Sequence, residues 1–131
     1  MYTVKGALER SEGNFASAIA AYQRSIDLQM HLCKAGCPKL GIEYSLRAEA
    51  YGMLGNHSQA ITDYQRSLSL LRTAGQSSRD YLRIELAYAA VLRADGSLAE
   101  AQRLETEAQS GLEKLRRVQC NGCTISAESF R

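Results

Sequence analysis

Four cysteines are the residues of this chain whose spacing most suggests a chemical role. They form two close pairs, Cys33-x3-Cys37 and Cys120-x2-Cys123. Four thiolates bind zinc when every sulfur lies about 2.3 Å from one metal ion, and a lone Cys-x2-Cys pair can act as a redox couple. Which chemistry is available depends on the elements that carry the four sulfurs.

The two histidines do not complete a catalytic or metal-binding set. Neither His31 nor His57 stands at a recurring catalytic or ligand spacing from a cysteine, an aspartate or a glutamate. The triplet Asn56-His57-Ser58 matches a glycosylation acceptor, but we interpret it as the cap of a helix. The sequence also lacks a phosphate-binding loop, a nucleophile elbow and a zinc-protease motif. We therefore predict a protein that is not an enzyme and that binds no metal and no cofactor.

Length and composition describe one globular domain. The 131 residues are 45% hydrophobic and 23% charged, as in ordinary folded chains, and a chain of this size can bury a core without disulfides or metals. With 16 basic and 14 acidic residues the net charge is +2. This balance does not indicate nucleic acid or a membrane surface as a partner.

The expected location is the cytoplasm. No apolar stretch approaches the roughly 18 residues of a membrane helix, and the first residues lack the basic and apolar segments of a signal peptide. Four cysteines are too few for a secreted disulfide scaffold. We therefore expect an intracellular, reducing compartment in which the cysteines are free thiols.

An internal repeat organises the chain. Residues 13–28 and 55–70 are identical at nine of 16 aligned positions, at a shift of 42. A weaker third copy begins at Gly96, at a shift of 41 from the second. Repeats of this length are typical of solenoids, in which each copy buries the apolar face of its neighbour.

Each copy is predicted to form two helices joined by a tight turn. In the middle copy Pro38 suits the first turn of a helix, Gly55 supplies the positive φ that ends it, and Asn56 caps the next helix. In the third copy Ser77 or Ser78 opens the first helix. We expect repeats at about residues 2–35, 37–75 and 77–119 in a domain of residues 1–120, followed by a tail of residues 121–131.

Small and large residues recur at equivalent positions. Helix axes that pack 8–10 Å apart need small side chains at the closest point, and a tyrosine can fill the wedge that opens further along. The residues expected to set this packing are Gly13, Ala18, Tyr22, Ala48, Gly55, Ala60, Tyr64, Ala89, Gly96 and Ala101. The same arrangement puts Cys33 and Cys120 at helix ends about 20 Å apart, which argues against one shared zinc site unless the tail folds back.

This pattern of small residue, turn glycine, alanine and aromatic resembles the tetratricopeptide repeat. The period of 41–42 residues is similar to the longer-repeat branch of kinesin light chains and Leu-Gly-Asn-repeat scaffolds. The resemblance implies an all-α fold, a right-handed superhelix or α-solenoid of about three repeats and roughly six antiparallel helices. Two positions depart from the pattern, since Lys5 stands where a large apolar residue is expected and Glu105 where the other copies have Tyr22 and Tyr64.

The resemblance also implies a binding groove, because the first helices of such repeats line the concave surface. The implied lining residues are Arg10, Ile42, Ser45, Leu46, Glu49, Met53, Arg83, Leu86, Ala90 and Arg93. Apolar side chains with three arginines and one acid suit a peptide or helix that carries apolar and acidic residues. The implied function is a scaffold that binds another protein.

Chaperone C-termini are not the expected partner. The positions that grip a terminal carboxylate in chaperone-binding repeats correspond here to Thr3, Ala7, Leu46, Arg83 and Ala87, and of these only Arg83 is basic. A buried carboxylate would lack hydrogen-bond donors there.

Two other functions stay open at this point. One is a regulatory domain switched by thiol oxidation or metal at Cys120 and Cys123. The other is a homo-oligomer in which a terminal element caps a second copy.

Overall fold

The computed structural model describes residue 6 and residues 13–33, 37–72 and 78–119. These ranges contain five α-helices and no strand: α2 (Phe15–Cys33), α3 (Pro38–Met53), α4 (His57–Arg72), α5 (Arg79–Ala94) and α6 (Leu98–Gln119). Apart from Gly6, which is helical and buried, the helix expected near residues 2–12 lies outside the described residues. The expected tail of residues 121–131 lies outside them as well.

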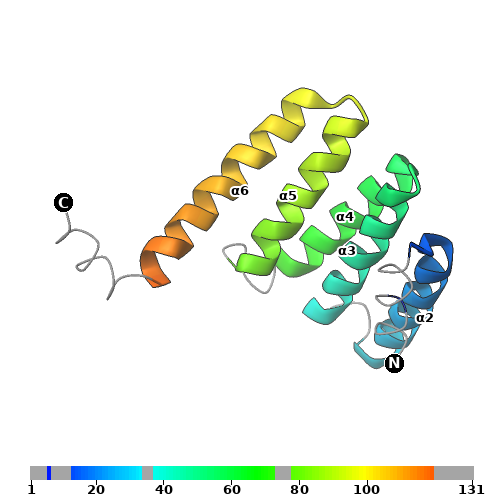
Figure 1. Cartoon of the computed structure of the whole chain (residues 1–131). Helices are drawn as coiled ribbons and strands as arrows, with labels where there is room; N and C mark the ends of the chain where they lie inside the picture. Colours follow the sequence, from blue (N-terminus) through cyan, green and yellow to red (C-terminus); the bar gives the residue numbers. More distant parts are fainter. Residues whose placement is uncertain (1–5, 7–12, 34–36, 73–77, 120–131) are drawn as a thin grey trace, which may run out of the picture.

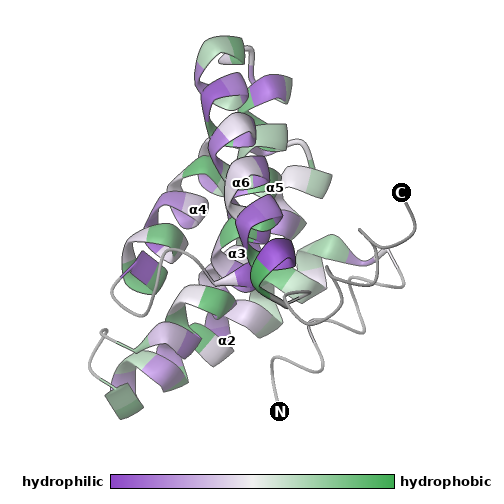
Figure 2. Ribbon diagram, turned by 90° about the vertical axis from the view of Figure 1, so that its left-hand side faces the viewer, coloured by the Kyte–Doolittle hydropathy of each residue, from purple (hydrophilic) through white to green (hydrophobic). Residues whose placement is uncertain are grey.

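The helices follow one another as antiparallel neighbours along a single array (Figure 1). Each packs against the next in sequence, and α3 also contacts α5. Each helix carries hydrophobic and hydrophilic segments on different sides (Figure 2), so one side is buried by its neighbours while another faces solvent. The prediction of an all-α helical-repeat solenoid is confirmed.

The turns inside the repeats have the same backbone conformation. Gly13, Gly55 and Gly96 have φ angles of 82°, 81° and 95°, a left-handed conformation that side chains with a Cβ rarely adopt. At other helix starts, Pro38 occupies the first turn of α3 and the Ser78 side chain accepts a hydrogen bond from the backbone N–H of Tyr81 at 3.1 Å. The turns at Gly55 and Gly96 give the α3–α4 and α5–α6 pairs the same reversal.

The small residues that were predicted to set the helix packing are buried. Ala18, Ala60 and Ala101 near the starts of α2, α4 and α6 are completely buried, as are Ala48 in α3 and Ala89 in α5. Their uniform burial shows that the copies pack in the same way, since a larger side chain at any of them would meet the facing helix.

The aromatic position differs at the end of the array. Tyr22 is fully buried and Tyr64 is 2% exposed, since a further repeat packs over each. Glu105, at the equivalent position of α6, is half-buried and forms an ion pair with Arg93 of α5. No repeat that follows α6 lies among the described residues, and a charged side chain suits this less enclosed position.

The two complete hairpins exchange a glycine and a leucine across their interface. In the α3–α4 hairpin Gly41 lies against Leu70 and Leu71, whereas in the α5–α6 hairpin Leu82 lies against Gly111. A shift of 41 carries Gly41 to Leu82 and Leu70 to Gly111. The combined volume of the two side chains stays the same while the glycine and the leucine exchange helices, as tight packing requires.

Candidate binding surfaces

The inner face is the surface that the sequence predicted as a groove, and nine of its ten residues are described. On α3, Met53 is exposed, Ile42, Leu46 and Glu49 are half-buried, and Ser45 is buried. The Ser45 hydroxyl donates to the backbone carbonyl of Ile42 at 2.7 Å, so it is already used within the helix. The contact between α3 and α5 brings these residues near those of the next repeat.

On α5 the inner face is more exposed and more cationic. Arg83, Ala90 and Arg93 are exposed and Leu86 is half-buried. Arg93 is engaged by Glu105 of α6. Arg83 forms no hydrogen bond or ion pair with the described residues. The tenth predicted residue, Arg10, lies outside the described ranges.

Two further grooves lie on the other side of α3 and α5. The α4–α6 groove has a volume of about 1150 Å³, and its floor is formed by Tyr81, Glu85 and Tyr88 of α5. The α3–α4 groove, of about 460 Å³, has Leu40 and Tyr44 of α3 on its floor. At 100° per residue the stripe of α5 that forms this floor lies on the side of the helix away from Arg83.

The two grooves are equivalent parts of successive repeats. Seven residues line the α3–α4 groove, and a shift of 41 carries every one of them onto a residue that lines the α4–α6 groove: Leu40, Tyr44, Thr62, Gln65, Arg66, Ser69 and Leu70. Differences in their side chains are therefore differences in the charge and chemistry of two equivalent grooves.

A buried ion pair stands beside the α3–α4 groove. Arg47 Nε donates to Asp63 Oδ2 at 2.7 Å and Arg47 Nη2 donates to Asp63 Oδ1 at 2.8 Å, with side-chain exposures of 9% and 1%. Arg47 also donates to the side-chain oxygen of Gln23 from α2, and its guanidinium lies 5.5 Å from the Tyr44 ring centre and 5.9 Å from that of Tyr51.

The Asp63 carboxylate compensates the positive charge of the buried Arg47 guanidinium. Burial pulls the pKa of Arg47 down, but its hydrogen bonds to Asp63 and the charge of that carboxylate more than reverse this, and the pKa is raised. Arg66 reaches the same place from α4, since its guanidinium lies 5.7 Å from the Tyr44 ring centre. The α3–α4 groove therefore has one arginine, Arg66, in its lining and a second, Arg47, beside the Tyr44 ring on its floor.

The floor of the α4–α6 groove has the opposite character. Glu85 is 7% exposed. Its pKa is raised, first by burial and then by the nearby charge of Glu107, and the charges of Arg72 and Arg103 oppose this only in part. Within the part of the chain that the structure describes, Glu85 forms no hydrogen bond and no ion pair. A carboxylate in this setting favours a ligand that carries positive charge.

The charged neighbours of Glu85 are engaged elsewhere. Arg72 Nη2 donates to the Tyr81 hydroxyl at 3.4 Å, and Arg103 lies 3.6 Å from a carboxylate oxygen of Glu107. Gln65 Nε2 donates to the Tyr88 hydroxyl at 3.1 Å. Each tyrosine hydroxyl thus accepts one hydrogen bond and keeps its own hydrogen for another acceptor.

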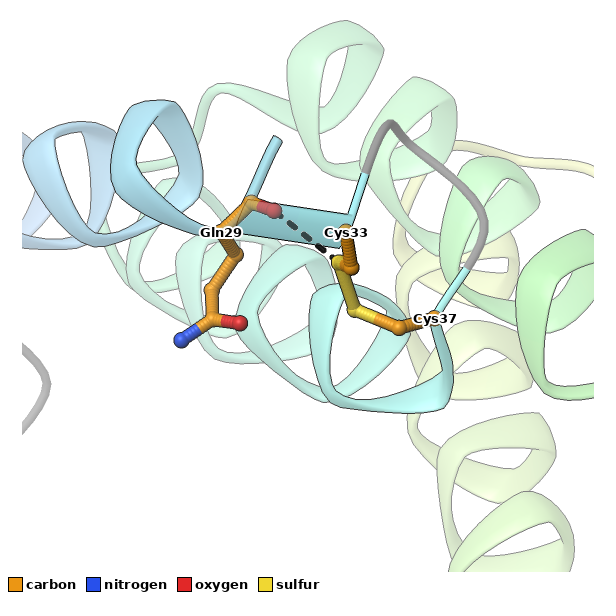
Figure 3. The surroundings of a disulfide bond; sticks show 3 residues. All are labelled: Gln29, Cys33 and Cys37. Atoms are coloured by element: carbon orange, nitrogen blue, oxygen red, sulfur yellow. Dashed lines mark hydrogen bonds between the residues drawn. A yellow bond between two sulfur atoms is a disulfide. The ribbon is translucent and has the colours of Figure 1, made fainter. Parts of the chain in front are cut away.

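The expectation of free thiols is wrong for the first cysteine pair. Cys33, the last residue of α2, is bonded to Cys37, the residue before α3 (Figure 3). The Gln29 carbonyl oxygen lies 2.9 Å from Cys33 Sγ, a contact that becomes a hydrogen bond only in the thiol form, because a disulfide sulfur carries no hydrogen. The error arose because the spacing was judged for metal binding, whereas the helix–loop–helix brings these two residues together.

The second cysteine pair, Cys120 and Cys123, lies outside the described residues. The hypothesis of a switch at the C-terminal cysteines therefore stays a prediction. In the described ranges no group of three or more histidine, cysteine, aspartate or glutamate residues is arranged to hold a metal ion. None of the helices described here is both long and apolar enough to cross a bilayer.

Sequence reasoning missed the Arg47–Asp63 pair and Glu85. A signal was present in the repeat itself, because Gln23 and Gln65 are identical in the first two copies. Both bond to a residue of the next repeat's first helix, Gln23 to Arg47 and Gln65 to Tyr88. A polar residue that recurs at an equivalent position of the repeat indicates that its hydrogen-bond partner also recurs at an equivalent position. Arg47 and Tyr88 are such partners, and they lie beside the two grooves.

Comparison with known proteins agrees with this architecture. The family model described as Tetratricopeptide repeat matches residues 1–73, which is more than half of the chain. No curated protein gives a significant match. With two-helix copies that share glycine turns, buried alanines and a 41–42-residue register, the protein belongs to the tetratricopeptide repeat family.

Proposed function

We propose that the protein is a non-catalytic scaffold whose inner face binds a segment of another protein. Tetratricopeptide repeats generally mediate protein–protein interactions, and the family is typically non-catalytic. The observation that carries the proposal is Arg83, an exposed cation with no ion-pair partner among the described residues. It stands one helical turn from the half-buried Leu86, so an apolar anchor and a charge lie together.

The partner is expected to be a peptide or a helix with apolar and acidic residues. An acidic side chain can form charge-assisted hydrogen bonds with the guanidinium of Arg83, while apolar side chains cover Ile42, Leu46 and Leu86. A chaperone C-terminal carboxylate is not proposed, because Leu46 and Ala87 stand where its hydrogen-bond donors are required. Neither a nucleic acid nor a membrane is proposed, since the net charge is only +2.

Two features of the sequence support two finer assignments: the repeat period supports the branch of the family, and the cysteine count supports the location. A shift of 41–42 residues between copies favours the longer-repeat branch similar to kinesin light chains, beyond the usual 34-residue repeat. The small number of cysteines favours the cytoplasm, although the Cys33–Cys37 disulfide is of a kind that glutathione and thioredoxin reduce in that compartment.

Affinity capture followed by calorimetry tests the scaffold function. Binding proteins are captured from native extract with the wild-type chain, and their binding segments are then titrated into wild type and Arg83→Glu. We expect the substitution to weaken binding by at least about tenfold, because it sets like charges against each other. Arg117→Glu, which makes the same charge change at an exposed residue of the last turn of α6, serves as the matched control.

The inner-face proposal fails if Arg83→Glu and Arg93→Glu leave the affinity of every captured partner unchanged. It also fails if Arg117→Glu weakens binding as much as Arg83→Glu, because the effect would then follow net charge rather than the inner face.

A further inference from the structure

The α3–α4 groove and the α4–α6 groove are equivalent, so a comparison shows which charged group of α3 has no counterpart on α5. A shift of 41 carries Tyr44 to Glu85 and Arg47 to Tyr88. The α3–α4 site contains a guanidinium that lies 5.5 Å from the Tyr44 ring centre. At the equivalent place the α4–α6 groove has a carboxylate and a tyrosine, with no cation from α5, and its basic lining residues Arg72, Arg103 and Lys114 come from α4 and α6.

The carboxylate of Glu85 is built into the groove rather than displayed at its edge. It is 7% exposed and yet lines a groove of about 1150 Å³. It has no hydrogen-bond or ion-pair partner in the described part of the chain. Burying a charged group without a partner is costly, so an external cation would gain a strong, poorly screened interaction here.

The surroundings select a particular kind of cation. Leu68 and Leu104, each less than 10% exposed, form apolar parts of the lining, and Leu115 and the exposed Val118 extend the apolar surface along α6. A groove of this size takes a chain segment rather than a single side chain. The lining holds three basic and three acidic side chains, so the negative charge that a cation can match is local to the buried Glu85. A segment with a single cation flanked by apolar residues matches that position and the apolar lining around it.

We propose that the α4–α6 groove binds an arginine or lysine side chain of a partner protein, carried between apolar residues on a helix or extended segment, with Glu85 as its ion-pair partner. This surface is separate from the inner face, and it takes a segment of opposite charge. The protein would thus hold an acidic segment on one side of α5 and a basic one on the other.

Selection from a random peptide display library tests the proposal without assuming the partner. The wild-type chain is used as bait, and enriched peptides are synthesised and titrated into wild type, Glu85→Gln and Asp95→Asn. Glu85→Gln keeps the size of the side chain and removes its charge. Asp95→Asn removes one negative charge at the exposed end of α5, outside the groove.

We expect one enriched class to carry a single arginine or lysine between apolar residues. These peptides should bind Glu85→Gln at least about tenfold more weakly and bind Asp95→Asn like wild type. They should also bind Arg83→Glu like wild type, which separates this groove from the proposed inner-face function. Adding the peptide should move the NMR signal of the Glu85 side-chain carboxyl, a readout that needs no mutation.

The proposal is overturned if no enriched class depends on a cationic residue, or if such peptides bind Glu85→Gln as tightly as wild type. It is also overturned if the groove is filled by a second copy. In that case sedimentation would show a wild-type dimer that Glu85→Gln dissociates.

Discussion

The α3–α4 and α5–α6 hairpins share one scaffold but bury charge differently. In the first, Arg47 is buried and bonded to Asp63, and α3 also buries Glu43. In the second, the cross-helix pair of Arg93 with Glu105 is exposed, and the buried ionisable group is Glu85, which has no partner in the described ranges. The comparison shows that glycine and alanine positions recur from repeat to repeat, while the positions between them carry different charges.

The largest expected effect comes from breaking the buried pair. Asp63→Asn leaves the Arg47 guanidinium buried without its counter-charge, and such a loss typically costs about 3–5 kcal/mol of the free energy of unfolding. Urea denaturation followed by circular dichroism measures it. Arg66→Gln is the control, because Arg66 is 56% exposed and lies 3.9 Å from Asp63, so its loss should cost less than about 1 kcal/mol.

A double variant shows whether the pair itself stabilises the fold. In Arg47→Met/Asp63→Leu neither charge of this buried pair remains, and we expect most of the stability lost in Asp63→Asn to return. If Asp63→Asn unfolds at the same urea concentration as wild type, the guanidinium is reached by water and the contrast between the hairpins disappears.

The exchanged glycines provide the second comparison. A Cβ at position 41 would lie 2.9 Å from Leu71 Cγ and 3.1 Å from the Ser67 carbonyl oxygen, whereas one at position 111 would meet the terminal methyl groups of Leu82 at 2.8 and 3.0 Å. A backbone oxygen cannot move aside, but a leucine end can. We therefore expect Gly41→Ala to lower the free energy of unfolding by about 1–2 kcal/mol, as overpacked cores do.

Gly111→Ala should be close to neutral. Alanine gains about 1 kcal/mol of helix propensity at either position, but only at position 111 does this gain offset the steric cost, because a leucine end moves more easily than a backbone oxygen. Thermal melts of the two variants give the comparison directly. Equal melting temperatures would mean that both interfaces accommodate an added methyl group equally well. The exchange of glycine and leucine would then not affect how tightly each hairpin is packed.

The scaffold was predictable because its determinants recur. The glycine turns and the buried alanines stand at one register in each copy, and each is required by local geometry, a positive φ or a close helix approach, that short sequence patterns reveal. The branch of the family, the superhelix handedness and the inner-face function are of another kind, since they depend on the assembled array or on a partner.

The outer grooves were not predictable, because their key residues do not recur. Asp63 corresponds to Ala21 in the first copy and Leu104 in the third, so a comparison of copies hides it. Whether a charge on a buried helix face has a partner depends on the neighbouring helix, as Arg47 and Glu85 show in opposite senses. The Cys33–Cys37 disulfide was missed for the same reason, because it joins two helix ends whose approach only the fold defines.

Acid titration sharpens the contrast at Glu85. Burial raises the pKa of this carboxyl in the folded state, so the folded chain binds its proton more tightly than the unfolded chain. Its contribution to stability is therefore full below the ordinary glutamate pKa and is lost as the pH rises through the raised value. The groups that face it are Arg72 from α4 and Arg103 and Glu107 from α6.

Glu85→Gln removes this dependence. We expect the variant to melt at a higher temperature than wild type at neutral pH, by less than the Gly41→Ala effect, and the difference to shrink on acidification. Melting curves across the acidic range measure it. A variant that is less stable than wild type at neutral pH would show that the carboxylate is already well partnered in the free protein.

Among the charged pairs, the smaller effect is expected at the exposed counterpart of the buried pair. Arg93 and Glu105 are 51% and 32% exposed, so water and salt screen their attraction, and Glu105→Gln should cost about 0.2–1 kcal/mol. In 1 M salt, where the screening length is about 3 Å, the loss should vanish, whereas that of Asp63→Asn should persist because the interior is screened far less. Urea melts of both variants at low and high salt provide the test. Equal salt sensitivity would mean that solvent screens both ion pairs to the same extent. The two hairpins would then differ in which charged residues they contain, but not in how strongly burial protects those charges.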